Sequence, residues 1–198
     1  MRAEANRTRP WPLFIVAIMV LSLAPTVTSS TTLVVWSGIV NLPDGAVIDD
    51  DQVVQIQPGT EIRIGEGESI EIDGRLSVLG TENQQVTVNS IDGKHDGIHF
   101  TSVSRGLGSS ISHLKIENAS RGIIIVDSDP LINNLTVLNA DFVAVDLFSS
   151  ANPQITNLTI LGGGQDVHGI AGTWRYGIGL SLGSGSAPIV DGLLADSL

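Results

Sequence analysis

The chain has 198 residues, of which 42% are hydrophobic and 16% charged, so it can bury a core and is not a disordered tail. It carries 21 acidic against 10 Lys and Arg residues, a formal net charge of −11, and such a surface repels nucleic acid and anionic lipid headgroups. There is no cysteine, so disulfides cannot hold the fold together. We therefore expect no nucleic-acid partner, and a fold held by packing and backbone hydrogen bonds.

Residues 1–30 have the layout of a secretory signal peptide. Three arginines precede an apolar run over residues 11–24, and the small, polar stretch TVTSS follows. The alternative is a membrane anchor, but a bilayer span needs about 20 apolar residues, and this run is shorter and contains a proline. We predict cleavage between Ala24 and Ser30, a secreted or cell-surface location, and no membrane association afterwards.

Residues 31–45 are interpreted as a lead-in to a repeat domain that spans 46–198. Asp49, Asp50 and Asp51 form an acidic run near its start, and carboxylates attract calcium. A solvated turn before a strand at Val53 explains the same run, and this is the interpretation we favour.

Apolar residues alternate with polar ones between residues 53 and 90. The alternation occurs in short pairs such as Val54/Ile56, Ile62/Ile64 and Ile70/Ile72, and glycines separate the pairs. Period-2 alternation between glycines predicts short strands, and no segment shows helical periodicity.

The densest group of metal-ligand types lies in DGKHDGIH, which contains Asp92, His95, Asp96 and His99. Imidazole and carboxylate are ligands for a divalent ion, with calcium as the candidate for the chain as a whole. However, we expect His95 in a loop and His99 on a strand, and two such residues do not share a face as they would on a helix. The cluster is therefore a weak metal-site prediction.

The second half of the chain contains an internal repeat. PLINNLTVL (130–138) and PQITNLTIL (153–161) align at an offset of 23 residues, and SISHLKIEN (110–118) precedes them by about the same step. We place APIVDGLLA (187–195) as a fourth copy, with Ile189 aligned to Ile155. A fixed period of 20 to 50 residues is typical of a stacked array.

Each copy has apolar residues at i, i+3 and i+5, a spacing that fits a strand only if one residue breaks its phase. That residue is His113, Asn134, Asn157 or Asp191, all of types that tolerate the left-handed backbone region. We predict a strand, a one-residue left-handed corner and a second strand in each copy. A further strand follows in GIIIV (122–126) and VAVDL (143–147), which are rich in β-branched residues.

Three sequons permit N-glycosylation in an exported chain, at Asn118, Asn134 and Asn157. The last two occupy the predicted corner, so backbone conformation already explains their asparagines. Only Asn118 has no such explanation.

The repeat is interrupted between Ile155 and Ile189, which are 34 residues apart. The excess falls in GGGQDVHGIAGTWRY (162–176), and insertions in repeat arrays form loops on one face, often the binding face. This loop holds the candidate ligand-binding residues Asp166, His168, Trp174, Arg175 and Tyr176. Aromatic faces pack on sugar rings, and Arg and Asp hydrogen-bond hydroxyls. In the alternative, Trp174 and Tyr176 only cover the coil beneath them.

VVQIQPGTEIRIGEGESIEIDGRLSVLGT (53–81), DGIHF (96–100) and the I-x-N-L-T-I copies resemble the right-handed parallel β-helix repeats of the pectate-lyase-like superfamily, in particular secreted bacterial and archaeal surface proteins. The resemblance implies an all-β solenoid of roughly seven coils at about 4.8 Å per coil. An antiparallel β-sandwich is the competing fold, but it predicts no aligned repeat. Because DGLLADSL stops inside a repeat, we interpret the solenoid as truncated. The open edge would pair with further coils of a longer chain or with another subunit.

Superfamily members that cleave uronate polymers use acidic clusters, often with calcium, and a Lys or Arg. The chain lacks the paired aspartates with Gly-His-Gly and Arg-Ile-Lys of the polygalacturonase branch; VHGIAG (167–172) is a partial echo. We assign no catalytic residue and predict a glycan-binding or adhesion module whose partner is a polysaccharide or surface glycan. The alternatives are a polysaccharide lyase or glycoside hydrolase with part of its catalytic groups elsewhere, and a purely structural spacer.

Overall fold

The computed structural model describes residues 30–163 and 178–196, which form β-strands and one short 3₁₀ turn (η1, Ser102–Ser104) without an α-helix. The strands are β1 (Thr32–Trp36), β2 (Ile39–Leu42), β3 (Ala46–Ile48), β4 (Gln52–Ile56), β5 (Glu61–Ile64), β6 (Ile70–Ile72), β7 (Arg75–Leu79), β8 (Val86–Ser90), β9 (Ile98–Phe100), β10 (Ser110–Glu117), β11 (Arg121–Val126), β12 (Leu131–Ala140), β13 (Val143–Phe148), β14 (Gln154–Gly163), β15 (Ile178–Leu182) and β16 (Ile189–Asp196).

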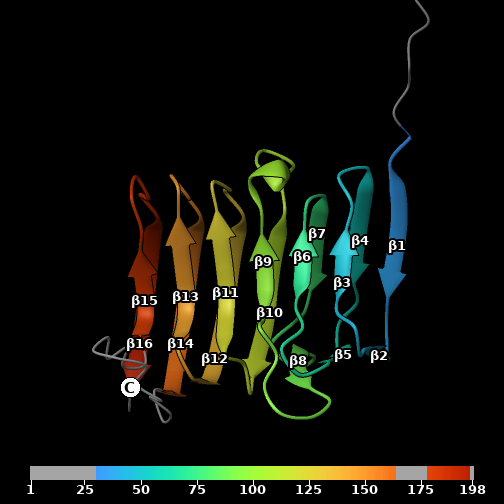
Figure 1. The fold of residues 1–198 in the computed structure, drawn as a ribbon, viewed down its shortest axis with the longest axis horizontal. Coiled ribbons are helices and arrows are strands. Elements are labelled where there is room, and N and C mark those ends of the chain that lie inside the picture. The colour runs from blue at the N-terminus through green and yellow to red at the C-terminus, as the bar shows by residue number, and fades with distance from the viewer. Residues whose placement is uncertain (1–29, 164–177, 197–198) are drawn as a thin grey trace, which may run out of the picture.

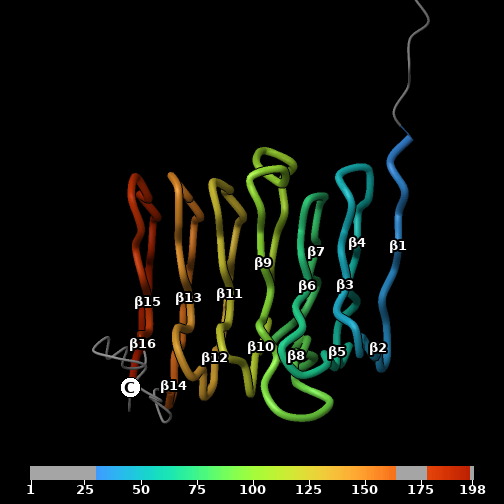
Figure 2. Tube along the Cα trace, viewed as in Figure 1, coloured from blue at the N-terminus to red at the C-terminus, as the bar shows by residue number. Residues whose placement is uncertain are grey.

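The strands form two parallel sheets that the chain visits in turn. In sheet A the main order is β1-β4-β7-β10-β12-β14-β16, with β2, β5 and β8 alongside, and in sheet B the order is β15-β13-β11-β9-β6-β3. Strands that follow one another in the chain therefore do not pair; each pairs with its counterpart one coil later. Figure 1 shows the coils side by side in chain order, and the tube in Figure 2 shows each coil as a flattened loop.

Parallel pairing throughout both sheets is compatible with a β-helix-like solenoid and excludes the antiparallel sandwich. The pairing begins at Thr32, where β1 pairs with β4, and β2 pairs with β5. Both strands lie within residues 31–45, which the sequence led us to treat as a lead-in. Together they supply the sheet A strands of the first coil.

The register confirms the first three copies of the repeat and corrects the fourth. Ile111, Ile132 and Ile155 are cross-strand partners, at the predicted offsets of 21 and 23 residues. In β16, however, Ile155 pairs with Val190 rather than Ile189. The predicted alignment of the last copy is therefore wrong by one residue.

The corner slot holds left-handed residues in every copy. The φ angle is +48° at His113, +55° at Asn134 and +57° at Asn157, as predicted. In the last copy the corresponding residue is Gly192, at +76°, and not Asp191. Glycine adopts this conformation without steric cost, which explains why the slot needs no asparagine there.

Side-chain hydrogen bonds join the corners into a ladder. Asn157 Nδ2 donates to Asn134 Oδ1 at 3.1 Å, and Asn134 Nδ2 donates to His113 Nε2 at 3.2 Å. Since Nε2 accepts, the proton of the His113 ring is on Nδ1, which donates to Ser112 Oγ at 2.9 Å. We call His113, Asn134 and Asn157 the corner ladder.

A second left-handed corner follows the same strands. Asn118 and Asn139 have φ angles of +57° and +55°, and Gly162 has +63°. Asn118 therefore also has a backbone explanation, which the sequence did not predict because the repeat indicated a left-handed corner at one slot only.

The core lies between the two sheets and consists of stacked rows of similar side chains. One row runs along sheet B through Ile70, Ile98, Ile123 and Val145, which are successive cross-strand partners. All four are at most 1% exposed. β-branched residues suit such rows because their stiff side chains pack well on a pleated surface.

The predicted signal peptide falls almost entirely within residues 1–29, which lie outside the described part of the chain. Within residues 30–163 and 178–196 there is no helix that is long and apolar enough to cross a bilayer.

Substitution of Asn134 tests the corner ladder. N134A places an alanine at a φ of +55° and removes the ladder hydrogen bonds, so we expect a loss of about 1–3 kcal/mol in the free energy of unfolding. N134G removes the same bonds but relieves the backbone, so its loss should be smaller. Denaturant titration of both variants measures the two effects. If N134G were as damaging as N134A, backbone strain would not contribute.

Candidate functional site

The predicted binding loop lies outside the described residues from position 164 onward. Residues 164–177 lie outside the described ranges, and with them all five candidates, which are Asp166, His168, Trp174, Arg175 and Tyr176. Their role in ligand binding stays a prediction.

His95, one of the predicted metal ligands, is fully buried and occupied by backbone groups. Its Nδ1 accepts a hydrogen bond from the Gly97 N–H at 3.0 Å, and its Nε2 lies 3.0 Å from the Glu117 carbonyl oxygen. An accepting Nδ1 together with a donating Nε2–H defines the neutral ring. Burial lowers the pKa of His95 below its ordinary value, and this outweighs the opposing effects of the Glu117 carbonyl and the Asp96 charge.

The other three members of that cluster do not converge on His95. His99 lies on β9, as predicted, with Nε2 at 2.5 Å from the Asp96 carbonyl oxygen and 3.6 Å from Asp96 Oδ2. Asp92 is exposed in the preceding loop. In the described residues no three His, Cys, Asp or Glu side chains are placed to hold a metal ion.

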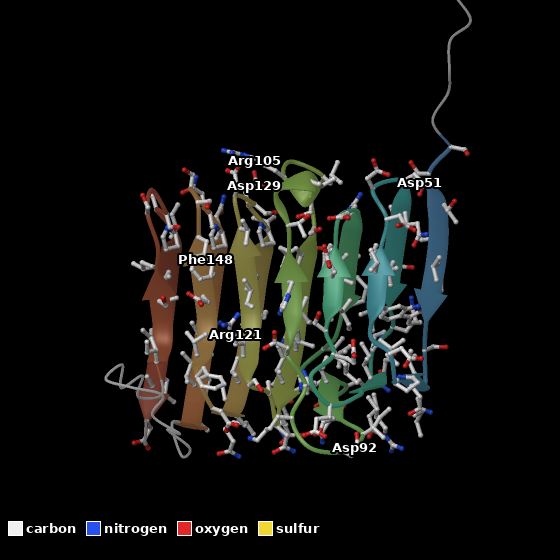
Figure 3. The ribbon with its side chains drawn as sticks, in the orientation of Figure 1. Asp51, Asp92, Arg105, Arg121, Asp129 and Phe148 are labelled. Atoms are coloured by element: carbon white, nitrogen blue, oxygen red, sulfur yellow. The ribbon has the colours of Figure 1, made fainter. Side chains whose placement is uncertain are left out.

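The acidic run at Asp49, Asp50 and Asp51 is an exposed turn between β3 and β4. Asp49 Oδ2 accepts a hydrogen bond from Gln52 Nε2 at 2.8 Å. Figure 3 places Asp51 and Asp92 at opposite ends of the strands, so the two acidic segments do not form a common site.

The three sequon asparagines all use the amide nitrogen that would carry a glycan. Asn118 Nδ2 donates to Asn89 Oδ1 at 3.0 Å, and Asn134 and Asn157 donate within the corner ladder. A glycan on Asn134 or Asn157 would therefore disturb the ladder.

A groove of about 400 Å³ crosses the outer face of sheet A, over β7, β10, β12 and β14. We call it the sheet A groove. Its outward-facing side chains form two cross-strand rows, and they are Ser110, Leu131 and Gln154 in one row and Leu79, Ser112, Asn133 and Thr156 in the other. Because each row consists of cross-strand partners, the rows run along the stacking direction, with neighbouring strands about 4.8 Å apart. None of the groove's lining residues is ionisable.

The corner ladder supports one side of this groove. Ser112 Oγ accepts from the His113 ring, and Asn133 Oδ1 accepts from Asn134 Nδ2 at 3.1 Å. Two of the groove's polar side chains are thus oriented by residues that the fold requires. Such support reduces the entropy lost when a ligand is bound.

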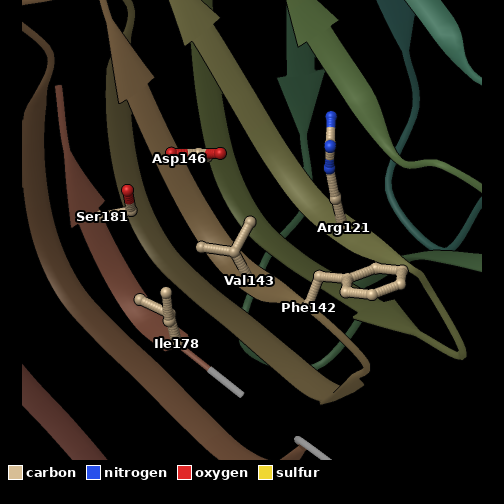
Figure 4. A pocket seen from close by; sticks show the side chains of 6 residues that line it. All are labelled: Arg121, Phe142, Val143, Asp146, Ile178 and Ser181. Atoms are coloured by element: carbon tan, nitrogen blue, oxygen red, sulfur yellow. The ribbon is translucent and has the colours of Figure 1, made fainter. Parts of the chain in front are cut away.

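A second hollow, of about 240 Å³, lies on the outer face of sheet B, where β11, β13 and β15 are neighbours. We call it the sheet B pocket. Figure 4 shows its lining, which consists of Arg121, Phe142, Val143, Asp146, Ile178 and Ser181. Asp146 is only 5% exposed, and its Oδ1 accepts no hydrogen bond from any residue that the structure describes.

Neither hollow was predicted from the sequence. The signal for the sheet B pocket was present, because Asp146 is a carboxylate within the otherwise apolar strand VAVDLF (143–148). A charged residue at such a position is seldom buried without a partner. The signal for the sheet A groove was weaker, because Ser, Thr, Asn and Gln are ordinary residues for an exposed strand face.

Comparison of the chain with models of protein families, with curated proteins and with solved structures found no match. The resemblance to the pectate-lyase-like superfamily therefore depends on the sequence features given above and on the parallel pairing.

His95 should make stability depend on pH. Its pKa is depressed in the folded state and near 6.5 in the unfolded chain, so the unfolded state binds more protons below that pH. The stabilisation is fully present above about pH 6.5 and is lost as the pH falls toward the folded-state pKa, at up to about 1.4 kcal/mol per pH unit.

The matched variant is H95Q, whose amide retains a donor and an acceptor. We expect the unfolding free energy of the wild type to fall more steeply than that of H95Q between pH 7 and pH 5, as measured by urea titration. The other titrating groups are common to both chains, so the difference isolates His95. Parallel pH profiles would contradict the assignment.

Proposed function

We propose that the chain is a secreted or cell-surface right-handed parallel β-helix of the pectate-lyase-like type and that it binds neutral glycans along the sheet A groove. The observation that carries the proposal is the composition of the groove's outward rows, which present hydroxyl and amide groups beside two apolar side chains, Leu79 and Leu131. Sugar hydroxyls both donate and accept hydrogen bonds, as amides and hydroxyls do.

The geometry of the groove suits an extended polymer. Its rows follow the stacking direction, so equivalent side chains recur at about 4.8 Å. Leu131 lies in the middle of one row and is 51% exposed, which offers an apolar contact for the C–H face of a sugar ring. Gln154 and Thr156 provide donors and acceptors on the next strand.

The groove has no ionisable lining residue, which favours binding over acid–base catalysis and neutral sugars over uronates. Lyases and hydrolases of uronate polymers need acid, base or cationic groups at the reacting sugar, and the groove's lining residues include none. The net charge of −11 further disfavours a polyanionic substrate. Polysaccharide lysis and a spacer role stay as alternatives that the following experiment separates.

The test is calorimetric titration of the full chain with neutral and uronate oligosaccharides of matched length, together with an assay for new reducing ends. We expect saturable binding of at least one neutral oligosaccharide without cleavage. N133A and Q154A should each weaken it about 10-fold, the effect of one lost hydrogen bond whose partner is left unsatisfied.

T136A is the matched control, because Thr136 also lies on β12 but beyond the corner at Asn134, outside the groove. New reducing ends would favour the enzymatic alternative. Absence of binding to every oligosaccharide, or equal weakening by T136A, would contradict the proposal.

A further inference from the structure

The sheet B pocket lies on a different sheet from the proposed glycan groove and has different chemistry. Its lining contains two groups of opposite charge, Arg121 and Asp146, and an apolar remainder. The register explains the placement: Arg121 is the partner of Val143, which is the partner of Ile178, while Asp146 is the partner of Ser181. The two charged residues therefore come from neighbouring strands and from different cross-strand rows.

Asp146 is the unusual member of the pocket. The residue is 5% exposed, yet none of the described residues donates a hydrogen bond to Oδ1, although Ser181 is the cross-strand partner of Asp146. A buried carboxylate oxygen without a hydrogen bond is strongly unfavourable, because the water lost on burial is not replaced. A donor supplied by a ligand in the pocket would replace it.

Arg121 is the second unpaired charge. It forms no ion pair and no side-chain hydrogen bond with any residue that the structure describes, and it is not within salt-bridge distance of Asp146. Figure 4 shows the two charged groups apart, on different strands. A lone ammonium ion would be attracted by Asp146 and repelled by Arg121, whereas a lone anion would experience the reverse.

We propose that the sheet B pocket binds a small zwitterion, with its ammonium group on Asp146, its carboxylate on Arg121 and its aliphatic chain on Val143 and Ile178. Each charged end then meets an unpaired group of opposite sign. Phe142, which lines the pocket and is 44% exposed, would cover the aliphatic part of the ligand. The ligand class is an amino acid whose amine and carboxylate are separated by a short hydrocarbon chain. This site is independent of the proposed glycan binding.

The test is calorimetric titration of the full chain with ω-amino acids that differ in the distance between amine and carboxylate. The ligands are 4-aminobutyrate, 6-aminohexanoate and 8-aminooctanoate. We expect saturable binding of at least one length. For the best length, the singly charged analogues with the same chain, which are the simple amine and the simple carboxylate, should bind at least 10-fold more weakly. No saturable binding of any length, or an amine that binds as tightly as the zwitterion, would overturn the proposal.

Variants separate the two charged contacts. D146N and R121Q should each weaken zwitterion binding at least 10-fold, and R121K should recover part of the loss. Glu71→Gln is the matched control, since Glu71 is an exposed carboxylate on β6 of the same sheet but outside the pocket. Binding that survives D146N unchanged would refute the assignment.

Thermal unfolding without ligand provides an independent readout. If Asp146 serves a ligand and not the fold, D146N removes an uncompensated buried charge, and its Tm should equal or exceed that of the wild type. A Tm clearly below that of the wild type would assign the carboxylate to the fold and overturn its role in binding.

Discussion

Parallel stacking in register is the constraint on which the rest of this molecule depends. Each coil forms its backbone hydrogen bonds with the coils before and after it, so every position must be compatible with the residue one coil away. In the core this requirement is met by rows of similar side chains, such as Ile70, Ile98, Ile123 and Val145. At the corners it is met by asparagines whose side chains form hydrogen bonds with one another. A chain without disulfides is thereby held by interactions that repeat along one axis.

The same constraint shapes the outer faces. Outward positions also form rows, and a row of polar residues beside an exposed leucine becomes a groove without any loop to build it. Because Ser112 and Asn133 are bonded to the corner ladder, the fold itself orients part of the proposed binding surface. On sheet B, Asp146 lies between Ile124 and Ser181, and its buried Oδ1 accepts no hydrogen bond within the described part of the chain. The lining of the sheet A groove is thus uncharged, while the sheet B pocket holds two residues of opposite charge.

The repeat could be predicted from the sequence because its physical causes are local. Asparagine and histidine at one-residue corners, and apolar residues on either side, are visible in single copies, and three copies agree with the structure. The fourth was misaligned because Asp191 resembles the other corner residues, whereas glycine, which adopts positive φ most easily, follows it. The β1 and β2 strands were missed because they lack that template.

The candidate sites were less accessible from sequence. Residues of metal-ligand types cluster around His95 in the sequence. In the structure, however, His95 is buried and both of its ring nitrogens are hydrogen-bonded to backbone groups, so neither is available to a metal ion. The sheet A groove and the sheet B pocket bring together residues from strands more than twenty positions apart, and no single segment reveals them. Only the carboxylate inside an apolar strand offered a local clue.

The stacking of coils determines how the length of such a binding surface can change. Because a coil contacts chiefly its two neighbours, a duplicated coil can enter the stack without a new kind of contact. Each added coil would extend the outward rows by about 4.8 Å and leave their width unchanged. The surface that binds a long polymer could therefore grow one coil at a time, and each added coil would present the same kinds of side chain.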